Sequence, residues 1–145
     1  MSDASDPYDL RRFVDAQAPV FEQVRAELRE GRKRSHWMWF VFPQIAGLGM
    51  SAMSRRYAIS SLDEARAYLE HPVLGPRLRE CTRLVMRVQD PSAEHLLGSI
   101  DAQKLRSSMT LFMRAAPDEL LFRQVIDQYF GGHTDSATDE RIQAL

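Results

Sequence analysis

Apolar residues recur along most of the chain at intervals of three and four, the spacing that places them on one face of an α-helix. The clearest rows lie in the segments 20–28, 62–69, 78–88, 102–112 and 121–129. Strict alternation of apolar and polar residues, the pattern of a half-buried strand, is not found. The pattern therefore predicts an all-α fold, a compact single-domain bundle of about seven to nine short helices, orthogonally packed. The domain is expected to span residues 1–145, with 1–6 as a flexible tail.

Prolines and capping residues divide these rows into separate helices. Most of the predicted starts place a capping side chain or a proline in the first helical turn. The predicted starts are Asp6–Pro7, Ser61 with Glu64, Gly75–Pro76, Asp90–Pro91, Pro117, and Ser136 or Thr138. Glycines mark two predicted ends, at Gly31 and at Gly131–Gly132.

The most unusual stretch runs from residue 33 to residue 57 and contains both tryptophans, Trp37 and Trp39. From Trp37 to the residue before Pro43 the chain is apolar without a break, and so short a run fits either a buried strand or a short buried helix. A helix is the preferred interpretation, because Ser35 can cap it and Pro43 can end it. A helix that is apolar all round is expected to be buried on most sides.

Composition and charge narrow the possible roles. Hydrophobic residues make up 44% of the chain and charged residues 27%, which is typical of a folded domain. With a net charge of -1, nothing global attracts the protein to nucleic acid or to an acidic membrane. The single cysteine, Cys81, excludes an internal disulfide. The N-terminus is no signal peptide, and no apolar run approaches the ~20 residues of a membrane helix. We therefore expect a cytoplasmic protein without a membrane or nucleic-acid partner.

No standard catalytic signature is present. The chain has no P-loop, no dinucleotide-binding glycine fingerprint, no zinc-protease motif and no nucleophile elbow. Its four histidines, His36, His71, His95 and His133, are scattered. We therefore predict neither a metal site nor a cofactor.

The candidate catalytic residue is His36, because an unperturbed histidine titrates near pH ~6.5 and commonly transfers protons. The alternative is a histidine bonded to a backbone carbonyl at a helix start. Trp37 and Trp39 could form a stacking wall for a flat ligand, or they could be ordinary core residues.

A polar stripe follows one face of the helix predicted at 101–115. Asp101, Lys104 and Ser108 share this face, and Ser107 lies near its edge. In a cleft the stripe could bind a phosphate or carboxylate, whereas toward water it would be an ordinary exposed face. The candidate ligand-binding residues are Lys33, Trp37, Trp39, Gln44, Ser51, Asp101, Lys104, Ser107 and Ser108.

Three distinctive motifs follow one another along the chain. They are Gly31-x-Lys33-x-x-His36-Trp37-Met38-Trp39, Phe42-Pro43-Gln44, and Asp101-x-x-Lys104-Leu105-x-Ser107-Ser108. A chain with these motifs resembles the bacterial family called domain of unknown function 1810, whose members are often labelled calpastatin. Calpastatin proper is a long disordered protease inhibitor, whereas the apolar content here predicts a folded domain. The resemblance implies a compact helical protein of unknown biochemistry and carries no catalytic residue with it.

Two hypotheses about function remain open. In the first, a small anionic or nucleotide-like ligand binds between the aromatic block and the 101–108 stripe, and whether a reaction follows is undecided. In the second, the chain is a protein-interaction module without chemistry. A concave pocket gathering His36, Gln44, Lys104 and Ser108 would favour the first, and a flat apolar surface the second.

Overall fold

The computed structural model describes residues 6–88 and 92–144, which form ten helices and no strand. The helices are α1 (Arg11–Gln17), α2 (Phe21–Glu30), α3 (Met38–Val41), α4 (Ala52–Arg56), α5 (Leu62–Glu70), α6 (Leu74–Arg87), α7 (Ala93–Leu97), α8 (Ser99–Ala115), α9 (Leu121–Phe130) and α10 (Ser136–Gln143). The only pairing of extended backbone in these ranges is an isolated bridge between Ile45 and Ile59. The predicted all-α fold is confirmed.

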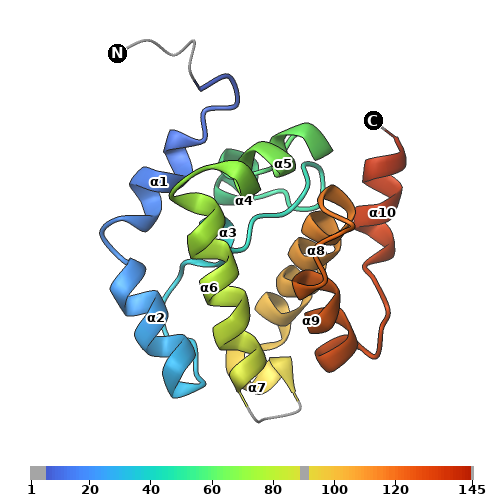
Figure 1. Ribbon diagram of the computed structural model, residues 1–145. Coiled ribbons are helices and arrows are strands. Elements are labelled where there is room, and N and C mark those ends of the chain that lie inside the picture. Colours follow the sequence, from blue (N-terminus) through green and yellow to red (C-terminus); the bar gives the residue numbers. More distant parts are fainter. Residues whose placement is uncertain (1–5, 89–91, 145) are drawn as a thin grey trace.

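Helix α8 is the longest and packs against α3, α5, α7, α9 and α10. In Figure 1, α6 runs down the front between α2 and α9, and α5 crosses its upper end. The predicted apolar row of α8 is buried in the core, and consists of Ala102, Leu105, Met109 and Phe112. None of the helices in the described ranges is both long and apolar enough to cross a membrane.

The first helix begins later than predicted. Its first residue is Arg11, and a turn precedes it in place of the helix expected from Pro7. The Asp6 carboxylate still satisfies the helix start, since it accepts the backbone N–H groups of Leu10 at 2.8 Å and Arg11 at 3.0 Å. Of the tail expected at 1–6, all but Asp6 lies outside the described residues.

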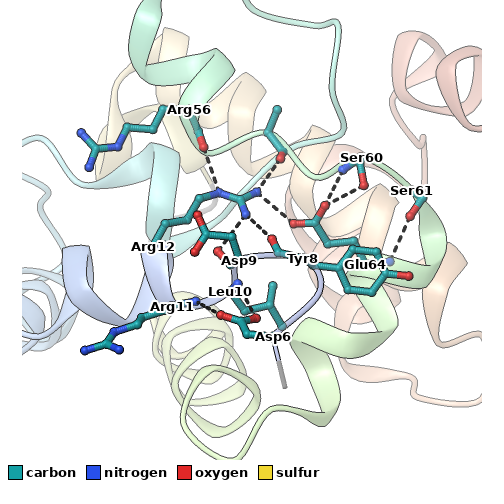
Figure 2. Close-up of polar contacts among 11 residues, drawn as sticks. Asp6, Tyr8, Asp9, Leu10, Arg11, Arg12, Arg56, Ser60, Ser61 and Glu64 are labelled. Carbon is teal, nitrogen blue, oxygen red and sulfur yellow. Dashed lines mark hydrogen bonds and ion pairs between the residues drawn. The ribbon is translucent and has the colours of Figure 1, made fainter. Parts of the chain in front are cut away.

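Arg12 fastens this N-terminal turn to the middle of the chain, as Figure 2 shows. Its guanidinium donates to the carbonyls of Arg56 and Ala58, each at 2.9 Å, and to the carboxylate of Glu64 at 2.9 Å. The same carboxylate accepts the N–H and hydroxyl of Ser60. Glu64 is also the predicted capping-box residue, and its N–H donates to Ser61.

Two further helix starts differ from the prediction. α9 begins at Leu121, because Pro117 lies in a turn over 116–120 that precedes the helix. α10 is capped by Asp135, whose carboxylate accepts the N–H of Thr138 at 3.0 Å, and not by Ser136 or Thr138.

The glycine ends are where the sequence predicts them. Gly31 and Gly131 close α2 and α9 in the left-handed conformation, with φ of 78° and 61°, which glycine adopts without steric cost. The start predicted at Asp90–Pro91 lies outside the described residues, and Ser92 is the N-cap of α7.

Candidate functional site

A pocket of about 310 Å³ opens between the aromatic block and the start of α8. One wall consists of Lys33, His36, Met38 and Trp39. The other wall is the end of α7, the connecting glycine and the first turns of α8. The pocket therefore joins the two segments that were singled out in the sequence.

Two lysines meet one aspartate in this pocket. The Lys33 ammonium lies 2.8 Å from one oxygen of Asp101, and the Lys104 ammonium lies 3.6 Å from the other. The exposed fraction of the side chain is 7% for Lys33 and 20% for Lys104. The Lys33 ammonium is thus buried against Asp101, whereas the Lys104 ammonium keeps N–H donors that a ligand can reach.

Each lysine also lies over a tryptophan. Lys33 is 5.2 Å from the ring centroid of Trp37, and Lys104 is 4.7 Å from that of Trp39. The negative face of an indole ring attracts a cation at such distances. Trp37 is buried and belongs to the core, whereas Trp39 is half-buried and lines the pocket.

A buried glutamate holds the segment that carries Lys33 and the tryptophans. Glu27 is 1% exposed, and its carboxylate accepts the backbone N–H groups of Arg34 and Ser35, the Ser35 hydroxyl at 2.6 Å and the Trp37 indole at 3.0 Å. Burial alone would raise the pKa of Glu27, but these hydrogen bonds outweigh it and lower the pKa to about 2. The side chain is therefore an anion at neutral pH, and it orders the loop before α3.

This arrangement corrects the role expected for Ser35. Ser35 does not cap α3, whose N-cap is Trp37 without a side-chain hydrogen bond. Its hydroxyl and N–H both serve Glu27 instead. The aromatic block is helical, as preferred, but only from Met38 to Val41.

Five of the predicted residues line the pocket. They are the proposed proton-transfer residue His36, which is exposed, and Lys33, Trp39, Asp101 and Lys104. Helical spacing places Asp101 and Lys104 on one face of α8. The ordered loop brings Lys33 and His36 to it, and α3 brings Trp39.

The other predicted residues have other surroundings. Ser51 is the N-cap of α4, and the Ser107 hydroxyl donates to Asp135 at 3.1 Å. Ser108 is buried in α8, and its hydroxyl has no hydrogen-bond partner in the described part of the chain. Gln44 adjoins the Ile45 bridge, and Trp37 lies behind the pocket wall.

The sequence carries two further signals of this site, one for its lysines and one for Glu27. The chain has 19 Lys and Arg residues, of which only two are lysines, and both line this pocket. Glu27 stands directly before Leu28 and three residues after Val24, so it borders the apolar row of its helix. A carboxylate in that position is a candidate for burial.

The described residues offer little to a metal ion. In these ranges no three His, Cys, Asp or Glu side chains gather closely enough to hold one. Burial raises the pKa of the Cys81 thiol to about 12, so this side chain is an unreactive part of the core.

Comparisons with known proteins agree with the fold. No curated protein matches the chain. The crystal structure of the conserved hypothetical protein Rv1873 from Mycobacterium tuberculosis is 56% identical in sequence, with a TM-score of 0.93, over 95% of this chain and 99% of that one. The family described as "Protein of unknown function (DUF1810)" matches residues 7–142. The chain therefore belongs to that family, as its motifs indicated.

Proposed function

We propose that this chain binds a small anionic ligand in the pocket between the aromatic block and α8. The observation that carries the proposal is the convergence of Lys33 and Lys104, the only lysines of the chain, on one aspartate in that pocket. Two ammonium groups against one carboxylate leave a positive excess. The first turn of α8 adds the partial positive charge of a helix N-terminus.

The geometry favours an anion over a stacked nucleotide base. A base needs a free aromatic face, and Lys104 occupies a face of Trp39 at 4.7 Å from the ring centroid. A ligand approaching that face meets the ammonium group first. A carboxylate or phosphate oxygen can accept a charge-assisted hydrogen bond there.

His36 is the residue that we would assign to chemistry, if the bound anion reacts. It lines the pocket and is exposed, so a ligand can reach its ring. Imidazole both accepts and donates protons near neutral pH. Binding is the core of the proposal, and a reaction at His36 is its extension. We expect the binding to take place in the cytosol.

The test is a thermal-shift screen with acetate, benzoate, sulfate, inorganic phosphate and sugar phosphates. A ligand of the native state at 100 times its Kd adds about 2.7 kcal/mol of stability and raises the Tm. At least one anion should stabilise the wild type and Arg114→Met, but not Lys104→Met. Arg114 is a matched control because it lies on the same helix, pairs with Asp139 and is remote from the pocket lining. Equal stabilisation of all three proteins, or of none, would refute the proposal.

A protein-interaction module is the second candidate, and one observation favours it. Ile100 lines the pocket and is 74% exposed, which suits contact with an apolar partner. That function predicts that none of the small anions stabilises the chain. The same screen therefore separates the two candidates.

A further inference from the structure

We infer that the pocket is built for a monocarboxylate with a compact apolar body. This inference rests on the proposed binding of an anion, and it adds the charge and the shape of the ligand. It is carried by the charge balance of the pocket, by its type of cation and by its apolar walls.

Among the groups that line the pocket, the two lysines and Asp101 leave a net charge of +1, which a single negative charge on the ligand would offset. Asp101 offsets one of the two lysines, and its closer contact is with the buried Lys33. Glu27, which accepts a hydrogen bond from the indole of Trp37, places a further negative charge behind the pocket wall. A carboxylate can be matched by Lys104. A phosphate monoester carries about −1.5 to −2 at neutral pH, so part of its charge would be desolvated without a partner.

The pocket uses lysine and not arginine, which also favours a carboxylate over a phosphate. Arginine presents a planar fork of donors that grips phosphate in a bidentate manner, whereas lysine is a compact point charge. Arginines make up all but two of the Lys and Arg residues of the chain, yet none of them lines the described pocket. Lys104 supplies the accessible ammonium group for a head group, since the side chain of Lys33 is buried against Asp101.

The apolar walls call for a hydrocarbon body on the ligand. Met38, Leu97 and Ile100 line the pocket beside the charged groups. Ile100 is largely exposed, and covering it with an apolar group removes its surface from water. The volume of about 310 Å³ is at the small end of the ~300–1,000 Å³ typical of ligand pockets. One ring or a short branched chain fits within it.

The experiment uses lysine labelled with ¹³C at Cε, because the chain then shows two side-chain NMR signals, both from the pocket. Lys104→Met assigns them. The probes are benzoate, phenyl phosphate and acetate, so that one pair shares a body and the other shares a head. We expect benzoate to shift the Lys104 signal with a Kd at least fivefold lower than that of either other probe.

Each other outcome has a distinct meaning. If no anion shifts either NMR signal, and no anion raises the Tm in the thermal screen, the proposed function itself fails. If phenyl phosphate binds more tightly than benzoate, anion binding stands but the monocarboxylate inference is wrong. If acetate binds as well as benzoate, the apolar body is wrong.

Two variants sharpen the result. Ile100→Ser changes an exposed residue, so the fold is expected to persist, and it should weaken benzoate several-fold while leaving acetate unchanged. Asp101→Asn raises the pocket charge by one and should shift the preference toward phenyl phosphate. Unchanged benzoate affinity in Ile100→Ser would overturn the role of the apolar wall, even if Asp101→Asn fails to fold.

Discussion

Two buried glutamates, Glu27 on α2 and Glu64 on α5, have their negative charges stabilised by different kinds of partner. Glu64 is paired with the Arg12 guanidinium at 2.9 Å, in the cluster of Figure 2. Glu27 makes no ion pair within the described ranges, and neutral donors surround it, among them the Ser35 hydroxyl and the Trp37 indole. Both carboxylates are almost fully removed from water.

The difference shows what each anion holds. The Arg12–Glu64 pair joins α1 to the start of α5, and its charges cancel. Glu27 instead satisfies the N–H groups of the irregular loop after α2, which have no helical partner. It leaves a net negative charge behind the wall of the pocket. One glutamate therefore serves the fold, while the other also shapes the candidate site.

The largest expected effect compares alanine substitutions of the two residues. Glu27→Ala strands the buried Trp37 indole and the donors of Ser35, and should lower the free energy of unfolding by about 3–5 kcal/mol. Glu64→Ala should lower it by about 1–2 kcal/mol, because Arg12 keeps its carbonyl acceptors. Urea unfolding of both variants measures this difference. Equal losses would mean that an ion pair and a set of neutral donors stabilise these anions alike.

The next effect depends on pH. The folded pKa of Glu27, about 2, lies below its ordinary value of 4.5, so the stabilisation is complete well above pH 4.5 and is lost as the pH falls through the folded pKa. The stability difference between wild type and Glu27→Gln should shrink by about 1–2 kcal/mol from about pH 6 to about pH 3. Denaturant melts at several pH values give this difference. A stability difference that does not change with pH would show that the hydrogen bonds do not lower the pKa of Glu27.

A smaller effect separates the serines that serve the two glutamates. Ser35 donates to Glu27 at 2.6 Å, and Ser60 donates to Glu64 at 2.7 Å. Ser35→Ala should cost about 1 kcal/mol, because its donor is half-buried and the acceptor is charged. Ser60 is exposed, so Ser60→Ala should cost less than about 0.5 kcal/mol. A reversed order in thermal melts would contradict the contrast drawn between the two sites.

Local signals explain which parts of the fold could be predicted. Gly31 ends its helix and Ser61 caps its helix through contacts within four residues, which a sequence displays directly. The start at Pro117 was wrong, because the next turn is not helical and α9 begins later. The helix predicted for the aromatic block is present as α3, but it covers only Met38–Val41, because the ends of so short a helix depend on tertiary contacts.

The residues on both sides of the candidate site were predicted, but their spatial arrangement was predictable only on the α8 side. The three-residue spacing of Asp101 and Lys104 puts both on one helical face, and they do pair. The approach of Lys33 depends on a loop without periodicity, held by Glu27 from another helix. Ser107 illustrates the limit of the helical pattern, because the turn of about 100° per residue directs it to Asp135 of the α10 cap.

A change in ligand affinity, and not in stability, tests whether Glu27 positions the candidate site. Glu27→Gln should weaken benzoate binding about 3–10-fold, or about 0.7–1.4 kcal/mol, at a temperature where the variant is folded. Glu64→Gln is the matched control, since it removes the same charge from an equally buried carboxylate and should leave the affinity unchanged. The sign of the effect is informative, because loss of a negative charge behind the wall would by itself favour an anion. Weaker binding therefore indicates that the loop carrying Lys33 and His36 has lost its geometry. Titration of the Lys104 NMR signal in all three proteins measures the affinities. Tighter binding to Glu27→Gln would show that Glu27 acts on the pocket through its charge and not by positioning it.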